Sequence, residues 1–480
     1  MVDLLVIGGG INGAGIARDA AGRGLSVVLA ERGDLGGATS SSSSKLIHGG
    51  LRYLEQYEFR LVGEALAERE ILLRTAAHLV HPATFVMPHV PGLRPRWMIR
   101  AGLFLYDHLA RRSLLPASRA IRLDAMPYGS GLKPGFRRGF CYADCSVDDA
   151  RLVVCNAADA AARGARVLVR TECLSALPDG HGWRATLSSG EVLSARVIVN
   201  AAGPWVKEVL NERLGVSSTE NVRLVKGSHI VVPRLYEGDH AFILQNDDRR
   251  VVFMIPFQTR FTLIGTTDVT ISAPDRPVAS PEEIEYLCRA VNRYVRNEVA
   301  PRQVLWSYSG VRPLHDDGST DPSAITRDYV LQLDHAGGGD VLSVFGGKIT
   351  TYRRLAEHAL DKLKPHFPEM KGAWTAAEPL AGSRFSSSEE AKRKLLERYP
   401  RLPAEEVLEV FARHGALAAQ VLGDGELGER YGGGLTEREV RYFVEREWAS
   451  TAEDVLWRRS KAGLQMSERQ RARVAQVLHG

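Results

Sequence analysis

The sequence predicts an α/β domain built on a parallel sheet, joined to an antiparallel-sheet domain and an α-helical C-terminal domain. Three observations support this fold class. The chain opens with a short apolar run, a glycine-rich turn and an alanine-rich stretch, which is the order of a strand leading into a helix. Segments rich in β-branched and aromatic residues fill the middle of the chain, and only helical patterns follow residue 376.

The parallel sheet begins with Asp3–Gly8, a short uninterrupted apolar run of the kind that is buried on both faces. Helical character over Ala14–Gly24 and a second buried strand, Leu25–Ala30, complete a βαβ unit. Two later strands are expected at Ala195–Ala201 and Val341–Phe345. Because these signals are scattered over the first 375 residues, we expect the α/β domain to be discontinuous.

The antiparallel sheet is expected from three strand-like runs, His229–Pro233, Arg250–Pro256 and Phe261–Thr267. The expected α/β domain comprises residues 1–75, 145–220 and 335–375, the antiparallel-sheet substrate domain comprises 76–144 and 221–334, and the helical domain comprises 376–480. In the helical domain four residue pairs have the capping-box spacing that satisfies free amides at a helix start. These pairs are Ser387/Glu390, Thr436/Glu439, Ser450/Glu453 and Ser467/Gln470.

The composition indicates a globular protein of several domains, with 480 residues, of which 44% are hydrophobic and 25% charged. The net charge of +5 suits an anionic substrate or an anionic membrane surface, and no reader motif for nucleic acid occurs. The five cysteines form no ligand-like cluster, which predicts free thiols and no metal site. The first strand starts almost at Met1, which leaves no room for a signal peptide, and no apolar run is long enough to span a bilayer.

The turn after the first strand, Gly8-Gly9-Gly10-Ile11-Asn12-Gly13, matches GxGxxG. Its first glycine permits a tight turn, its second lets the backbone approach a pyrophosphate, and its third lets helix and strand pack closely. The helix start then points free amides at the phosphates. Glu31 follows at about the expected 20 residues and would accept hydrogen bonds from ribose hydroxyls. The carboxylate would repel a 2′-phosphate, which disfavours NADP, while NAD and FAD both stay open.

A serine-rich run, Ser40–Ser44, leads directly into Lys45–Tyr53, which mixes apolar, ionisable and glycine residues. A flexible linker is one interpretation of the run. A linker does not usually lead into such a mixture, so we favour a functional loop. Residues Thr39–Ser44 can supply hydroxyls and amides to a phosphate or a flavin.

At these residues the sequence resembles the FAD-dependent glycerol-3-phosphate dehydrogenases of the quinone-linked, aerobic type. The resemblance is carried by short stretches spread over the first 375 residues, and the helical tail resembles the family more loosely. The stretches are Gly8–Gly24, Ser42–Leu54, Asp144–Leu152, Asn200–Lys207, Val225–Pro233, Ile264–Asp268, Tyr308–Leu314 and Ser343–Arg353.

The resemblance implies a Rossmann-like FAD-binding domain of the glutathione-reductase/D-amino-acid-oxidase type. It also implies hydride transfer from sn-glycerol 3-phosphate to FAD, which yields dihydroxyacetone phosphate, and delivery of the electrons to a membrane quinone. The expected location is peripheral (monotopic) on the inner, cytoplasmic face of the membrane, and a homodimer is one open arrangement. The expected cofactor-binding residues are Gly8, Gly10, Ile11, Asn12, Gly13, Glu31, Arg32, Thr39, Ser40, Ser44, Lys45, Leu46, His48, Ala202, Gly203, Trp205, Gly346, Gly347, Lys348, Ile349 and Thr350.

Oxidation of a phosphorylated secondary alcohol by a flavin needs a grip on the phosphate, a base for the hydroxyl proton, and positive charge near the reduced flavin. Arg52 and Arg312 are expected to bind the phosphate, with Tyr53 as a hydroxyl donor. Each arginine could instead belong to a surface ion pair. Thr266 is expected either to hydrogen-bond the substrate or to stabilise its own turn.

The expected base is His48, because the ordinary pKa of histidine lies near neutrality. A structural contact to the flavin is the alternative role of His48, and His229 is the second candidate base. The segment Gly346–Thr350 follows a strand and opens a helix, which would aim backbone amides at the flavin edge that gains negative charge. Lys348 would add a positive charge there or reach the substrate, and Lys348 or Arg312 could stabilise an alkoxide.

Membrane attachment is expected from Met98, Ala101, Leu105 and Leu109, which recur at helical spacing between arginines. This pattern is typical of a helix in the bilayer interface or of a helix that faces the core; the resemblance favours the interface. Three other functions stay open: an oxidase that passes electrons to oxygen, an amino-acid-oxidising flavoprotein of the same fold, and a flavin-binding scaffold without activity. Relatives with an iron–sulfur module are disfavoured because no cysteine follows Cys288.

Overall fold

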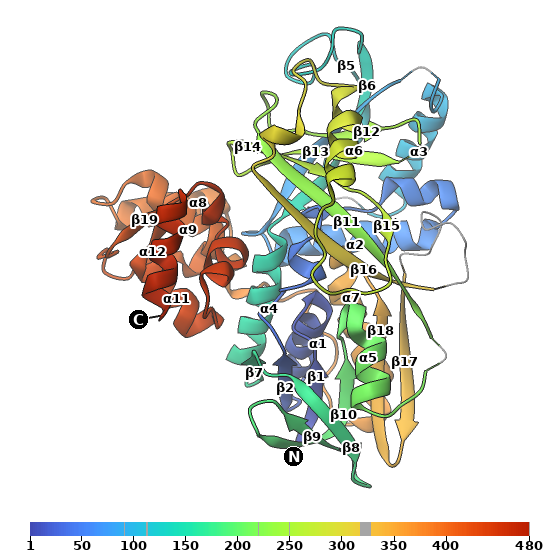
Figure 1. The fold of residues 1–480 in the computed structure, drawn as a ribbon, viewed down its shortest axis with the longest axis vertical. Helices are drawn as coiled ribbons and strands as arrows, with labels where there is room; N and C mark the ends of the chain where they lie inside the picture. Colours follow the sequence, from blue (N-terminus) through green and yellow to red (C-terminus); the bar gives the residue numbers. More distant parts are fainter. Residues whose placement is uncertain (91, 112–113, 219, 249, 317–327, 480) are drawn as a thin grey trace.

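The computed structural model describes residues 1–90, 92–111, 114–218, 220–248, 250–316 and 328–479. Two large sheets lie one above the other in the view of Figure 1, and a cluster of helices lies to their side. Among the described residues no helix is both long and apolar enough to cross a bilayer.

The first sheet has the strand order β17-β18-β10-β1-β2-β7, and β1 pairs in parallel with both β10 and β2. Leu4 and Val6 of β1 face one hydrophobic core, and Leu5 and Ile7 face another. Burial on both faces explains the uninterrupted apolar run. The strands are β1 (Val2–Ile7), β2 (Val27–Glu31), β7 (Arg166–Val169), β10 (Val192–Asn200), β17 (Tyr329–Ala336) and β18 (Gly339–Gly346), and β8 (Cys173–Pro178) and β9 (Trp183–Leu187) extend the sheet from β10.

Three helices cover the Leu4 face of this sheet, α1 (Ile11–Gly22), α4 (Asp149–Ala162) and α7 (Tyr352–Leu363), and all contribute to the same core. The predicted unit of strand, glycine turn, helix and strand is confirmed as β1, α1 and β2, with parallel pairing of the two strands. Gly15 of α1 lets α7 approach closely, since a Cβ there would lie 2.7 Å from the ring of Tyr352.

The second sheet has the order β15-β11-β14-β13-β12-β4-β6-β3 and is antiparallel except for the pairing of β12 with β4. Its faces are covered by α6 (Pro281–Asn292) on one side and by α2 (Phe59–Thr75) and α3 (Arg96–His108) on the other. The strands are β3 (Leu46–Ile47), β4 (Val80–Pro88), β5 (Arg119–Arg122), β6 (Arg138–Val147), β11 (Val222–Pro233), β12 (Ala241–Gln245), β13 (Val251–Phe257), β14 (Phe261–Gly265), β15 (Val269–Thr270) and β16 (Trp306–His315).

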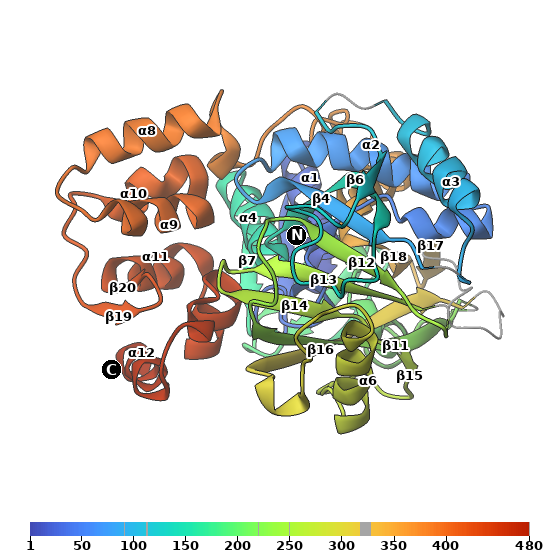
Figure 2. The ribbon, with the colours of Figure 1, turned by 90° about the horizontal axis from the view of Figure 1, so that it is seen from above.

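The C-terminal helices form a body of their own beside α4, as Figures 1 and 2 both show. They have two small hydrophobic cores that are separate from those of the sheets. The helices are α8 (Ser388–Arg398), α9 (Ala404–His414), α10 (Ala418–Leu422), α11 (Glu437–Glu447) and α12 (Glu468–His479), and a hairpin of β19 (Arg430–Gly432) and β20 (Leu435–Thr436) joins α10 to α11.

The predicted cap at Ser450/Glu453 is wrong by one residue. The amides of Ser450 and Thr451 both donate to Asp454, and the Thr451 hydroxyl accepts from the Asp454 amide. The π-helical segment Asp454–Arg459 follows. Both bonds of the predicted box form at α12, whereas at α8 and α11 only the Ser387 and Thr436 hydroxyls accept from the helix amide. The expected domain boundaries stay a prediction; β3 and β17 each pair in the sheet to which those boundaries did not assign them.

Candidate active site

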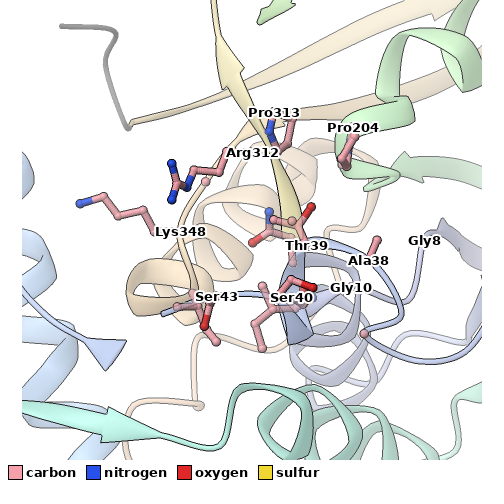
Figure 3. A pocket seen from close by; sticks show the side chains of 18 of the residues that line it. Gly8, Gly10, Ala38, Thr39, Ser40, Ser43, Pro204, Arg312, Pro313 and Lys348 are labelled. Carbon is pink, nitrogen blue, oxygen red and sulfur yellow. Dashed lines mark hydrogen bonds between the residues drawn. The ribbon is translucent and has the colours of Figure 1, made fainter. Parts of the chain in front are cut away.

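A cavity of about 700 Å³ lies where the carboxyl ends of β1, β2, β10 and β18 meet the second sheet. Ligands of parallel α/β sheets bind at this edge. Three parts of the chain supply the walls: turns of the first sheet, strands of the second sheet, and a segment of the C-terminal domain. Figure 3 shows Gly8 and Gly10 toward one end of the cavity and the side chains of Arg312 and Lys348 toward the other.

The glycine turn leaves no room for a side chain at Gly8 or at Gly13. Gly8 has φ +107°, and a Cβ there would lie 2.5 Å from the carbonyl oxygen of Ala201. A Cβ at Gly13 would lie 1.9 Å from the carbonyl oxygen of Gly8. Both glycines are therefore required by close backbone contacts, and the turn brings the start of α1 to the cavity wall.

The Glu31 carboxylate is fixed at the end of β2 by the backbone amides of Gly9 (2.6 Å) and Gly33 (2.7 Å). Burial raises the pKa of Glu31 and these two hydrogen bonds lower it in part. Beside it, the Arg32 guanidinium lies 4.2 Å from the ring centroid of Trp205, so the two side chains form one wall of the cavity.

The serine-rich loop is an ordered part of the wall, because its side chains have partners. Thr39 donates to the carbonyl of Val311, and the Ser40 hydroxyl accepts from the Ile11 amide at 2.9 Å. The Lys45 ammonium is buried outside the cavity lining, where it donates to Asp149 at 2.8 Å. For the Lys45 side chain the geometry therefore supports a structural role in holding the loop on α4.

Arg312 is held in place at the other end of the cavity. Its guanidinium forms an ion pair with Asp268 and donates to the Thr266 hydroxyl at 2.9 Å. Both partners belong to the turn after β14, and Arg312 extends from β16. Thr266 therefore orients the arginine, a role that the sequence did not suggest.

The second cationic group at this end is Lys348, whose ammonium lies 4.4 Å from the ring centroid of Tyr53. It precedes the helical segment that leads into α7. Arg52 lines the same cavity, and its guanidinium forms no hydrogen bond or ion pair with the part of the chain that the structure describes. Arg312 and Lys348 thus border one end of the cavity, and Arg52 lines the cavity next in sequence to Tyr53, the contact of Lys348.

The two candidate histidines occupy different positions. His48 lines the cavity, and burial, followed by the charges of Lys348 and Arg69, lowers the pKa of His48 to about 3. His229 is buried behind the wall, stacked on Tyr308, with its Nε2 2.9 Å from the Ser44 hydroxyl. Only His48 has access to the cavity, and it is neutral there at physiological pH.

Nearly all the predicted site residues line this one cavity; Gly13 and Lys45 do not. The predicted residues on its wall are Gly8, Gly10, Ile11, Asn12, Glu31, Arg32, Thr39, Ser40, Ser44, Leu46, His48, Arg52, Tyr53, Ala202, Gly203, Trp205, Thr266, Arg312, Gly346, Gly347, Lys348, Ile349 and Thr350.

Several cavity residues were not predicted from the sequence. Asp268 was inside a quoted stretch, but nothing in the sequence linked it to Arg312. Arg170 follows β7, the sheet's last strand, and had no motif to mark it. The C-terminal segment with Thr451 and Arg458 reaches the cavity through tertiary packing alone, and no sequence signal pointed to it.

The residues at the strand ends fit FAD. The turn has room only for glycine, the α1 start is open to the cavity, and Glu31 lies where a ribose would be bound. The buried Oδ1 of Asn12 has no hydrogen-bond partner in the described part of the chain. This oxygen is therefore left to accept a hydrogen bond from a bound ligand. Gly8, Gly10, Asn12 and Glu31 would hold the dinucleotide half of the group.

Buried histidines predict a loss of stability in mild acid. The pKa values of His48, His78, His229 and His414 are all lowered, mainly by burial. Above pH 7 these groups are neutral in both the folded and the unfolded chain. Below the unfolded pKa of about 6.5 the unfolded chain takes up protons that the folded chain excludes, so the free energy of unfolding falls by up to about 1.4 kcal/mol per pH unit for each group.

Urea unfolding of the FAD-loaded protein at pH 7.5 and pH 5.5 would measure this loss. The matched variant His48→Asn removes one of the groups, so its midpoint should change less with pH than that of the wild type. An equal change in both proteins would show that His48 is protonated in the fold.

Comparison with known proteins places the chain among flavoproteins. Residues 3–353 match the family described as FAD dependent oxidoreductase, and residues 373–479 match the C-terminal domain of alpha-glycerophosphate oxidase. A solved glycerol-3-phosphate dehydrogenase of Bacillus halodurans, complexed with FAD, is similar with a TM-score of 0.73 and 26% identity over 100% of this chain and 94% of its own.

Curated relatives are similar along their whole length. A glycerol-3-phosphate dehydrogenase of Pseudomonas aeruginosa is 55% identical over 99% of this chain and 94% of its own. The D-erythritol 1-phosphate dehydrogenase of Brucella abortus is 51% identical, over 98% and 96%. The aerobic glycerol-3-phosphate dehydrogenase of Escherichia coli is 49% identical, over 99% and 97%.

Proposed function

The chain belongs to the FAD-dependent glycerol-3-phosphate dehydrogenases, and we propose that it oxidises glycerol 3-phosphate to dihydroxyacetone phosphate at the end of the cavity bordered by Arg52, Arg312 and Lys348. The observation that supports this placement is the separation of roles within one cavity. The glycine turn and Glu31 suit a dinucleotide at one end, and the cationic side chains of Arg312 and Lys348 suit a phosphate ester at the other.

Arg52 and Arg312 bind the phosphate in this proposal, with Tyr53 as a further donor. Planar guanidinium groups bind phosphate oxygens in pairs, which fixes the orientation of the ester as well as its charge. The ion pair with Asp268 keeps Arg312 in one orientation before substrate arrives. A clamp that is already oriented places the neighbouring carbinol at a fixed distance from the Gly347–Lys348 turn.

His48 takes the hydroxyl proton in this proposal, since it is neutral and lies on the cavity wall. Its low pKa makes it a weak base, so a positive charge must stabilise the alkoxide that forms. Lys348 is placed to supply that charge. When bound, FAD supplies the acceptor for the hydride of the carbinol carbon.

Anaerobic reduction of the purified yellow protein tests the function. Bleaching of the flavin absorbance by glycerol 3-phosphate, and not by glycerol or an amino acid, is the expected result. D-Erythritol 1-phosphate belongs in the same experiment, because one relative is named for it. Faster bleaching by the erythritol ester would assign the longer polyol phosphate as the substrate, and an unbleached flavin with every ester would overturn the proposal.

The proposed electron acceptor is a membrane quinone. The rival acceptor is oxygen. It must be tested because residues 373–479 match the C-terminal domain of an oxidase. Reoxidation of the reduced flavin by a water-soluble quinone and by dissolved oxygen, followed separately by stopped flow, distinguishes them. Fast reoxidation by oxygen with stoichiometric peroxide would establish the oxidase.

The proposed membrane contact is the outer face of α3. Trp97, Met98, Phe104 and Leu105 are exposed there by 71%, 42%, 53% and 42%, while Ile99, Leu103 and Tyr106 on the opposite face pack into a core. The helix therefore has one apolar face toward the core and one toward the surface. The sequence pattern alone did not show which apolar residues belong to which face. An exposed apolar face flanked by arginines suits the interface of an anionic bilayer.

Substitution Trp97→Glu is expected to weaken binding to vesicles that contain an anionic phospholipid by about tenfold, because a large apolar side chain no longer enters the bilayer. Flavin reduction in solution should be unchanged. The matched control is Leu177→Glu on β8, an apolar residue that is 67% exposed elsewhere. Equal vesicle binding by the two variants would contradict docking through α3.

A further inference from the structure

The C-terminal domain is joined to the first sheet by a buried network of charges that borders the cavity. Asp34, three residues after Glu31, is 5% exposed. Its carboxylate accepts two hydrogen bonds from Arg459, each 2.7 Å, and one from Arg458. Both arginines belong to the π-helical segment Asp454–Arg459.

A second connection lies next to the first. Arg170 donates from its backbone amide to the carbonyl of Gly33 at 2.9 Å, and its guanidinium pairs with the buried Asp454 at 2.8 Å. Asp454 also binds Arg458 at 2.6 Å. The loop that follows Glu31 is thus joined to the C-terminal segment directly through Asp34 and indirectly through Arg170.

This network forms part of the cavity wall. Thr451, Glu453, Asp454 and Arg458 line the cavity together with the loop residues 31–34 and with Arg170. In dinucleotide-binding sheets, the acid at the end of the second strand binds the adenosine ribose. The C-terminal residues therefore lie at the adenosine end.

Docking of the two domains does not by itself explain this arrangement. Two other ion pairs, the buried pair of Arg151 with Glu447 and the partly buried pair of Lys461 with Asp148, join the same domains, and none of these four side chains lines the cavity. Buried ion pairs add little to stability on their own. An additional network at the cavity wall therefore indicates a role at the cavity itself, beyond joining the two domains.

We propose that the C-terminal domain is a component of the cofactor site, in which Thr451, Glu453, Asp454 and Arg458 close the pocket around the adenosine of FAD. Three arginines (170, 458 and 459) face three carboxylates (34, 453 and 454), so the charges of the network balance, and Arg459 lies behind the residues that line the cavity. A charge-balanced network of donors and acceptors suits the uncharged ribose and adenine, whereas the pyrophosphate belongs at the glycine turn. The inference rests on the proposed placement of FAD, with its adenosine at Glu31.

Titration of the apoprotein with FAD, followed by quenching of flavin fluorescence, tests the inference. Arg458→Gln should raise the FAD dissociation constant by at least about tenfold, as expected for loss of a charged hydrogen-bonding group. The matched control, Lys461→Met, loses an interdomain ion pair away from the cavity and should bind FAD as the wild type does. Equal affinities in the two variants would overturn the inference.

Hydrogen–deuterium exchange of the unmodified protein gives an answer that does not depend on whether a variant folds. FAD should protect the amides of residues 450–458 together with those of residues 31–37. Protection of the second group without the first would refute the role of the C-terminal domain and leave the cofactor placement intact. Protection of neither would refute the placement itself.

Discussion

Replacement of Arg312 by methionine is expected to lower kcat/KM for flavin reduction by glycerol 3-phosphate by about 10²- to 10³-fold, or about 3 to 4 kcal/mol of transition-state stabilisation. Methionine keeps much of the length of the side chain and removes the paired donors. The dianionic phosphate then loses its oriented partner, and the carbinol is no longer fixed. Stopped-flow bleaching of the flavin at several substrate concentrations measures the change.

Two controls separate the loss of the phosphate contact from a general disturbance. The flavin absorbance of the variant should match that of the wild type, because Arg312 lies at the end of the cavity away from the glycine turn. Asp268→Asn keeps the guanidinium and removes only its ion-pair partner, so a smaller effect of about tenfold is expected. If the Arg312→Met enzyme keeps kcat/KM within a few-fold of the wild type, the phosphate lies elsewhere.

Local sequence rules predicted which residues of the first two strand ends line the cavity; their contact with the cofactor stays a prediction. A buried strand, a GxGxxG turn and an acid at the end of the next strand lie within about 30 consecutive residues, so their contacts depend little on the rest of the fold. The carbonyl of Gly8 in contact with Gly13 is a consequence of this short loop. The family resemblance then added Arg312 and Lys348 to the expected site. Arg312 lies on β16 and Lys348 in the turn after β18, and only the completed sheets bring both to the cavity.

The remaining parts of the site depend on contacts between distant residues. Nothing near Arg312 in sequence reveals that Asp268, 44 positions away, holds its guanidinium. The partner of Asp34 lies 425 positions further along, at Arg459. The ordinary pKa of histidine also did not predict that burial lowers the pKa of His48 to about 3. Each of these features is decided by tertiary burial, which a local pattern does not encode.

Substitution of alanine for Gly8 is expected to yield a colourless protein that fails to retain FAD through purification. Two effects combine at this position. The φ of +107° is unfavourable for any residue with a Cβ, which costs about 1 to 2 kcal/mol. The new methyl group would also lie 2.5 Å from the carbonyl oxygen of Ala201, a backbone atom that cannot rotate away, so β1 and the turn after β10 must separate at the cavity wall.

Gly24→Ala distinguishes the two effects, because Gly24 has a similar φ of +94° and no described atom lies within 4 Å of the position that its new methyl group would take. This control should lose only the backbone contribution of about 1 to 2 kcal/mol in the free energy of unfolding, and it should keep its flavin. A Gly8→Ala protein that is as yellow as Gly24→Ala would mean that the strand ends can separate without loss of FAD. The tight contact between the glycine turn and Ala201 would then not be what positions the cofactor.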